Sequence, residues 1–293
     1  MHPSVPRPIR LVLVLATIAS LLALPSLASA APKGSGIQFT VTALNSAVSP
    51  NMSAGFQVFV KNGGKATLTH ATLTATASGA VTSPPATCSA ALVCDLGTLT
   101  SGGERTLVFV LTAPSSGAVS LSARLQVDAG SGNPSQDAGM KADSSDVNTS
   151  PAFFGTWHGA NASLTGAIKT DHQTASVSVP AVGFAYPAAL SEASGKVCGE
   201  QGIGQAVDMH FANGQSVLPN LLTVTVKYDA TARGNRSPGN VGFVHQADSG
   251  ACTTLVKGCA TAGCFNAFWE GNGPNKKLVI VALLASNGRG KGL

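Results

Sequence analysis

Few side chains in this sequence have the chemistry of an active site. The ionisable residues that could contribute to one are Glu200, Asp208, His210, Asp229, His245 and Asp248. Residues two positions apart in a strand point to the same face, so Asp208 and His210 would present a carboxylate and an imidazole side by side. Together with His245, this pair could bind a metal ion or act as a hydrolase on an extracellular polymer. An exposed polar strand face explains the same spacing without any chemistry, and we favour that interpretation.

Short motifs add no chemistry to this group. Asp248-Ser249-Gly250 looks like the nucleophile segment of a serine protease, but no other protease segment accompanies it. The sequence contains no G-x-S-x-G, no H-E-x-x-H, no phosphate-binding glycine loop and no Cys-His-Met pattern of blue copper. Asp143 and Asp146 fall short of the roughly six to eight oxygen ligands that Ca²⁺ takes. We therefore predict no catalytic residue, no cofactor and no metal.

Aromatic side chains offer a second type of binding site, because sugar rings stack on exposed aromatic platforms. The Trp and Tyr residues of the chain are Trp157, Tyr186, Tyr228 and Trp269. A carbohydrate-binding module built around Trp269 is therefore one alternative function. We favour core packing and loop anchoring for these residues, which are common roles of large aromatic side chains.

The six cysteines predict three disulfides, because their number is even and residues 1–30 have the pattern of an export signal. Cys88 and Cys94 are close enough in sequence for a hairpin or loop to bridge them. The remaining four, which allow three pairings, are Cys198, Cys252, Cys259 and Cys264. We favour Cys259–Cys264, inside a Gly-rich loop expected over residues 247–268, together with Cys198–Cys252. The alternative is a zinc site of four thiolates, but the spacing lacks the C-x2-C pairs of common structural sites.

The N-terminus has the pattern of a secretory signal peptide. Arg7 and Arg10 precede an apolar run over residues 11–24, and Pro25 and the small residues of Ala28-Ser29-Ala30 follow it. The run is shorter than the roughly 20 residues of a membrane-spanning helix, so cleavage after Ala30 is favoured over a membrane anchor. We expect the mature protein to be secreted or to stay at the cell envelope.

Charge gives little indication of a partner. Removing residues 1–30 removes two of the 18 basic residues and none of the 13 acidic ones, so 16 minus 13 leaves a net charge of +3. Lys276-Lys277 and Arg289-Gly290-Lys291 are local basic clusters, which we interpret as solvated turns. Nucleic-acid binding proteins usually show a basic face with stacking aromatics, and this pattern is missing here. The apolar run at residues 278–285 is too short to cross a bilayer.

Apolar and polar residues alternate along most of the mature chain, which is typical of β-strands. The clearest alternation lies at residues 119–127. The other predicted strands cover residues 37–42, 56–61, 67–76, 92–99, 106–112, 175–179, 207–211, 222–226, 241–244 and 278–284. The last is continuously apolar, as expected for a central strand buried on both faces. This pattern predicts an all-β fold with two β-sandwich domains, residues 35–147 and 154–293, joined by a linker at residues 148–153.

Two segments resemble a bacterial surface repeat that has an immunoglobulin-like fold and is known mainly as a domain of unknown function. They are V-F-V-K-N-G-G-K-A-T-L-T-H-A-T-L-T-A-T at residues 58–76 and C-D-L-G-T-L-x-x-G-G at residues 94–103. The similarity extends over residues 37–147, with an Asp- and Asn-containing tail at residues 130–146. It implies a surface-exposed or secreted spacer and no catalytic residue.

The second half is similar, more loosely, to β-rich C-terminal regions of uncharacterised secreted bacterial proteins. The matching pieces include V-C-G-E-Q at residues 197–201 and A-S-N-G-R-G-K-G at residues 285–292. That similarity implies no activity. The sequence as a whole therefore predicts a non-catalytic exported bacterial protein that interacts at the cell surface, in the envelope or in a matrix, with an unidentified extracellular protein or glycan as partner.

Overall fold

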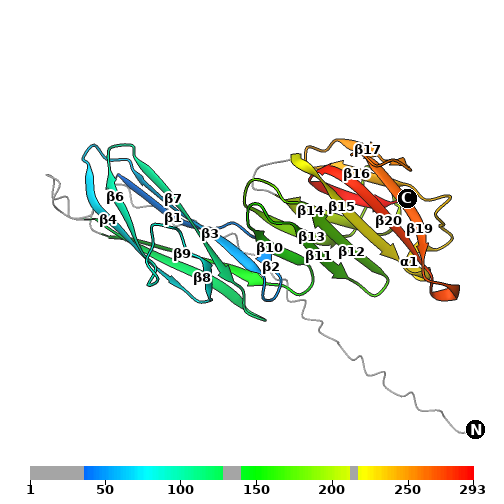
Figure 1. Cartoon of the computed structure of the whole chain (residues 1–293), viewed down its shortest axis with the longest axis horizontal. Helices are drawn as coiled ribbons and strands as arrows, with labels where there is room; N and C mark the ends of the chain where they lie inside the picture. Colours follow the sequence, from blue (N-terminus) through cyan, green and yellow to red (C-terminus); the bar gives the residue numbers. More distant parts are fainter. Residues whose placement is uncertain (1–35, 128–139, 212–216) are drawn as a thin grey trace, which may run out of the picture. The chain divides into compact units, whose positions relative to one another are not determined.

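The computed structural model describes residues 36–127, 140–211 and 217–293, and in these ranges the regular secondary structure is almost entirely β-strand (Figure 1). The predicted signal peptide, residues 1–30, lies outside the described residues. Within the described ranges, no helix is long and apolar enough to cross a membrane. The predicted all-β fold with two sandwiches is confirmed.

The first nine strands form a sandwich of two sheets. One sheet contains β1 (Ile37–Ala43), β3 (Ser53–Asn62), β7 (Glu104–Thr112) and β5 (Val81–Ser83), in that order. The other contains β2 (Ala47–Val48), β9 (Met140–Thr149), β8 (Ala118–Gln126), β4 (Leu68–Ala77) and β6 (Val93–Leu99). The sheet of β1, β3 and β7 faces that of β9, β8 and β4, which is the arrangement of immunoglobulin-like sandwiches.

The core of this sandwich follows directly from the alternation in the sequence. In β8, Val119, Leu121 and Leu125 are at most 1% exposed, while the polar residues that alternate with the buried ones face outward. Phe56 of β3 and Phe109 of β7 are fully buried in the same cluster. Burying each such side chain contributes about 1.5–3 kcal/mol to folding, so the apolar stripes determine which face of each sheet turns inward.

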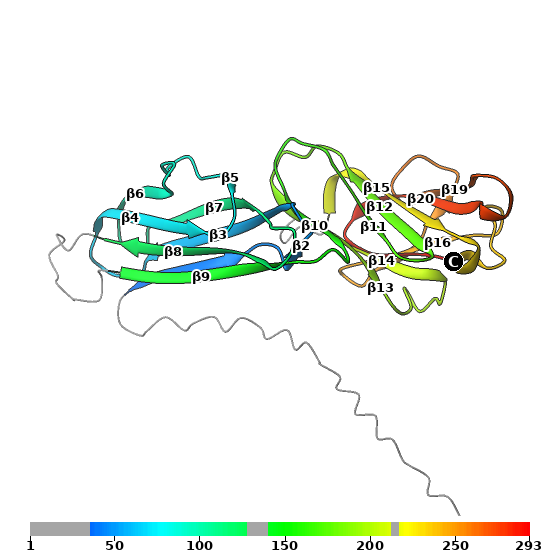
Figure 2. The ribbon, with the colours of Figure 1, turned by 90° about the horizontal axis from the view of Figure 1, so that it is seen from below.

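Strand β9 closes one side of the first sandwich and corrects the prediction of an Asp- and Asn-containing tail there. Strand β9 lies beside β8 in its sheet (Figure 2). The Asp143 carboxylate accepts a hydrogen bond from Val41 N at 2.7 Å, and Ser145 Oγ accepts one from Ala43 N at 3.1 Å. These side chains satisfy backbone donors on the outer edge of β1, where a free edge would otherwise invite pairing with another chain. Asp143 therefore has a structural role, and residues 140–146 are strand.

Twelve further strands form the second sandwich, in two sheets of six (Figure 1). The β14 sheet consists, in order, of β10 (Phe154–His158), β13 (Tyr186–Ala193), β14 (Ile203–Phe211), β21 (Gly288–Gly292), β16 (Phe243–Ala247) and β17 (Cys252–Thr254). The β20 sheet consists of β11 (Leu164–Lys169), β12 (Gln173–Val179), β15 (Val217–Tyr228), β20 (Lys277–Ser286), β19 (Cys264–Glu270) and β18 (Val256–Lys257). A four-residue helix, α1 (Ala230–Arg233), follows β15, and a 3-10 turn, η1 (Gly273–Asn275), precedes β20.

The second core lies between these two sheets and is separate from the first. Its fully buried side chains include Tyr186, Phe211 and Phe243 from the β14 sheet and Tyr228 and Ile280 from the β20 sheet. Strand β20 lies in the middle of its sheet, as its apolar run predicted, although Val281 and Leu283 on its outer face are only half-buried. The predicted loop at residues 247–268 contains β17, β18 and most of β19.

The connection between the two sandwiches is shorter than the linker predicted at residues 148–153, and hydrogen bonds hold it in place. Asn148 and Thr149 belong to β9, and Ser150 N donates to Val48 O at 2.8 Å. Ser49 N donates to Gly155 O, and Gly155 N donates to Ser49 Oγ, both at 2.9 Å. Strand β10 is thus hydrogen-bonded along its edge to the segment that follows β2.

Strand β21 was not predicted from the sequence, where Arg289-Gly290-Lys291 was interpreted as a solvated turn. It lies between β14 and β16, and Lys291 is only 2% exposed, with its Nζ donating to Gly195 O at 2.8 Å. Gly290 and Gly292 of this strand lie against core side chains, which leave no room for a Cβ atom. A Cβ added at Gly290 would lie 2.6 Å from Phe243 Cζ, closer than real carbon contacts allow.

Candidate functional site

Four ionisable side chains meet on the outer face of the β14 sheet. We call Asp208, His210, Asp248 and Arg289 the His210 cluster. Val207, Met209 and Phe211 of β14 point into the core, so Asp208 and His210 point to the opposite face, as their spacing predicted. Arg289 is the direct cross-strand partner of Asp208 on β21, and Asp248 follows the end of β16.

The contacts within the cluster pair each cation with a carboxylate. His210 Nε2 lies 3.1 Å from Asp208 Oδ1, and His210 Nδ1 lies 3.9 Å from Asp248 Oδ2. Arg289 Nε donates to Asp208 Oδ2 at 3.3 Å. The His210 side chain is 57% exposed and that of Asp208 is 14% exposed, so the cluster lies at the surface with Asp208 at its base.

These contacts shift the pKa of His210 and the pKa of Asp208 in the directions that favour their charged forms. The hydrogen bond to Asp208 raises the pKa of His210, and the two nearby carboxylates add to it against the opposing effect of burial. Burial by itself would raise the pKa of Asp208. The hydrogen bond from His210 and the charges of His210 and Arg289 outweigh it and lower that pKa. The cluster therefore favours the imidazolium form of His210, which lies between two carboxylates.

Acid–base catalysis by His210 would need a reacting group beside its ring. A general base must be unprotonated and within hydrogen-bond reach of the proton that it takes. Here one ring nitrogen of His210 is bonded to Asp208 and the other faces Asp248. In the part of the chain that the structure describes, no hydroxyl or thiol is hydrogen-bonded to His210, so the cluster contains no activated nucleophile.

His245 does not join this cluster, although the sequence grouped it with Asp208 and His210. It pairs across β21 with Gly290, which in turn pairs with Val207, so His245 lies on the core-facing side of the sheet. It is 6% exposed, and its Nε2 has no hydrogen-bond partner among the described residues. Burial lowers the pKa of His245, so it is neutral in the fold. The three-residue hydrolase site therefore does not form.

Trp269 is half-buried and packs against the second core at its end. Its ring is covered by the Arg233 guanidinium, 5.0 Å from the ring centroid, and by Lys276 Nζ at 4.4 Å. On a ring face that either cation occupies, a sugar could stack only if that cation moved away. Tyr186 and Tyr228 are fully buried, in keeping with the core packing that we favoured for them.

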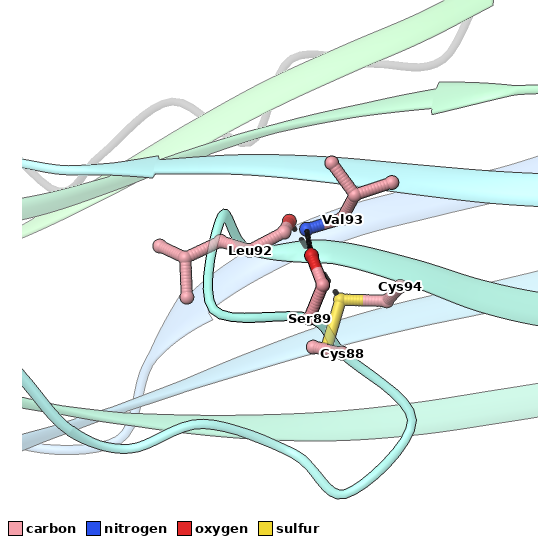
Figure 3. Close-up of a disulfide and its surroundings, with 5 residues drawn as sticks. All are labelled: Cys88, Ser89, Leu92, Val93 and Cys94. Atoms are coloured by element: carbon pink, nitrogen blue, oxygen red, sulfur yellow. Dashed lines mark hydrogen bonds between the residues drawn. A yellow bond between two sulfur atoms is a disulfide. The ribbon is translucent and has the colours of Figure 1, made fainter.

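All six cysteines are paired as favoured from the sequence. Cys88 and Cys94 are joined at the start of β6, where Val93 N donates to Ser89 Oγ at 3.3 Å inside the loop (Figure 3). The other two disulfides are Cys198–Cys252 and Cys259–Cys264. With all six cysteines in disulfides, no free thiolate is left to form the four-thiolate zinc site. Among the described residues, no group of three or more His, Cys, Asp or Glu side chains is placed to hold a metal ion.

Arg289 is the cluster member that sequence reasoning missed. It lies 81 residues from Asp208, and the Gly-rich strand that carries it has no apolar residue to reveal its alternation. The signal that could have found it is the G-x-G-x-G period itself, which places Arg289 and Lys291 on one face and the glycines on the other.

Comparison with known proteins assigns no family. No protein-family model matches the chain, and no curated protein matches it significantly. Among solved structures, the chain is similar to the CARDB domain of the PF1109 protein of Pyrococcus furiosus, crystallised in complex with di-metal ions. The identity is 16% and the TM-score 0.29, over 39% of this chain and 87% of that one.

Two other solved structures are similar at the same low level. The sporulation control protein Spo0M of Bacillus subtilis shares 12% identity, with a TM-score of 0.23 over 60% of this chain and 79% of that one. A DUF4466 family protein of Parabacteroides merdae shares 9% identity, with a TM-score of 0.24 over 86% of this chain and 99% of that one. Similarities this weak transfer no function, so the site must be interpreted from its own geometry.

Proposed function

We propose that this chain is an exported, non-catalytic interaction protein of the bacterial surface, envelope or extracellular matrix. The observation that carries the proposal is the His210 cluster. Its imidazole is held between two carboxylates with a raised pKa, on an open sheet face and without a nucleophile. The pattern of a signal peptide at residues 1–30 and the three disulfides support an oxidising, extracytoplasmic location.

The proposal includes a division into residues 35–147 and 154–293, with the first part a spacer similar to bacterial surface repeats. Buried apolar residues support the division, because they form one cluster from Ile37 to Val147 and another from Phe154 to Leu284. Limited proteolysis tests it. Cleavage within residues 150–153, which lie between β9 and β10, should release two stable fragments. A single resistant core would contradict the division.

The rival function is a hydrolase that acts on extracellular polymer. The test is a screen of the exported full chain against polysaccharide and ester substrates, with His210→Ala and His172→Ala as matched variants. His172 is a comparable control, because it is 55% exposed and its Nδ1 lies 2.9 Å from Asp229 Oδ2. We expect no turnover from any of the three proteins. Turnover by the unmodified chain that His210→Ala abolishes and His172→Ala preserves would refute the non-catalytic proposal.

A further inference from the structure

Positive charge gathers around Trp269 at one end of the second sandwich. Arg233 is the last residue of α1, and Lys276 directly follows η1. The Arg233 guanidinium and Lys276 Nζ lie 5.0 Å and 4.4 Å from the centroid of the Trp269 ring, so a single indole positions two cations. Two further cations, both exposed, lie close by in the sequence: Arg236 follows Arg233 after two residues, and Lys277 follows Lys276 directly.

The nearby carboxylates are already engaged elsewhere. Glu270, next to Trp269, accepts from Lys227 Nζ at 2.6 Å. Asp229 pairs with His172 and also accepts hydrogen bonds from two backbone N–H groups at the start of α1. Among the residues that the structure describes, neither Arg233 nor Lys276 forms an ion pair. The two cations, each within 5.0 Å of the same ring centroid, thus lack a countercharge from the described residues, which leaves both available to pair with an anion.

The donors of these two cations are also incompletely used. Arg233 Nη1 donates to Gly234 O at 3.0 Å, while its Nε is buried without a partner. The guanidinium and the ammonium offer two binding positions for oxyanions, since the planar guanidinium fork suits a carboxylate or phosphate and the ammonium supplies a point charge. Trp269 keeps both groups in place by packing against the core.

The surroundings of this group favour a glycan over a protein partner. The turn that carries Lys276 exposes Asn272 and Asn275, whose uncharged amides suit sugar hydroxyl groups. Phe268, the exposed large hydrophobic of β19, lies on the opposite face of that strand from Trp269, because the two are adjacent in sequence. The apolar core that protein interfaces usually contain is therefore not next to the two cations.

We propose that Arg233 and Lys276, positioned by Trp269, bind the acidic groups of an extracellular glycan. The acidic group is a carboxylate or a phosphate ester, which the same two cations recognise. This inference rests on the proposed function as an interaction protein and specifies the chemistry of the partner. The site lies outside the His210 cluster and uses none of its residues.

Binding of the exported full chain to defined polymers at low salt tests the inference. The probes are polygalacturonate for carboxylate, poly(glycerol phosphate) for phosphate, dextran for neutral sugar and polyglutamate for an acidic protein. We expect binding to one or both acidic glycans and none to dextran. Tryptophan emission should change with occupancy, because Trp269 is one of only two tryptophans in the chain.

The matched variants separate a specific site from general charge. Arg233→Gln and Lys276→Gln should each weaken glycan binding about tenfold, the usual effect of losing a hydrogen bond to a charged group. The control, Lys65→Gln with Lys196→Gln, removes as much charge at two exposed lysines elsewhere and should leave the affinity unchanged. Circular dichroism of each variant checks that the fold is retained.

Three results would overturn the inference: unchanged glycan affinity when both cations are replaced, equal binding of dextran, or polyglutamate binding at least as tight as that of the glycans. Each leaves the non-catalytic proposal intact, because that proposal fails only on turnover that depends on His210. Binding to only one of the two acidic glycans would support the inference and identify the acidic group.

Discussion

Replacing Gly290 by alanine should destabilise the second sandwich, because β21 has room for a hydrogen atom but not for a methyl group. An added Cβ would lie 2.6 Å from Phe243 Cζ and 2.8 Å from Phe243 Cε1, where an ordinary contact needs at least 3.4 Å. Phe243 is fully buried on the neighbouring strand, so its ring cannot move away without displacing the core. Such overpacking costs about 1–3 kcal/mol, which lowers the melting temperature of a domain this size by roughly 2–4 °C per kcal/mol.

The assay is urea unfolding of the disulfide-bonded chain, followed by near-ultraviolet circular dichroism. Gly159→Ala is the matched control, because no atom lies within 4 Å of its added Cβ. That substitution should be neutral or slightly stabilising, since alanine reduces the entropy of the unfolded chain. Combining Gly290→Ala with Phe243→Leu should cost less than the sum of the two single changes, because leucine removes the ring atoms that clash.

Equal stability of Gly290→Ala and Gly159→Ala would refute this account of β21. It would mean that the C-terminal glycines do not face Phe243 in a central strand. Additive costs in the double variant would point the same way, because the loss would then come from somewhere other than the contact between these two residues.

Stability should also depend on pH, with opposite signs for two histidines. Burial lowers the folded-state pKa of His245, so as the pH drops the unfolded chain binds a proton at this histidine before the folded chain does. The free energy of unfolding therefore falls below about pH 6.5. His245→Gln should reduce this loss of stability in urea titrations. The raised pKa of His210 adds stability below about pH 6.5, and this stability is lost as the pH rises through the folded-state pKa of His210. His210→Asn should therefore destabilise the protein more at pH 5.5 than at pH 9. Mass spectrometry of exported protein should find Ala31 at the N-terminus, whereas an intact N-terminus in membranes would favour an anchor. Replacing Cys88 and Cys94 by serine should cost about 2 kcal/mol, because the loop that they close is short, and no change would show that the bridge is dispensable.

Local pattern was sufficient for the parts of the fold where side chains alternate in polarity. Residues 119–127 were predicted as a strand from that alternation, and β8 covers Ala118–Gln126. The spacing of Asp208 and His210 likewise placed them on one face, and the Cys88–Cys94 pair followed from its short separation. Each of these inferences depends only on neighbours in the chain, because the period of a strand is a local property.

Tertiary structure decided which strands lie next to each other, and therefore which side chains meet. Asp208 faces Arg289 because β14 pairs with β21, and no local pattern contains that information. Strand β21 escaped prediction because Phe243 supplies the apolar volume that Gly290 lacks. The sequence alone thus determined the all-β class, the Cys88–Cys94 pair and the expectation of export, whereas the structure decided among the three pairings of the other four cysteines. Only the pairing of distant strands turned His245 into the core and set His210 between two carboxylates, since burial and charge neighbours are properties of the folded chain.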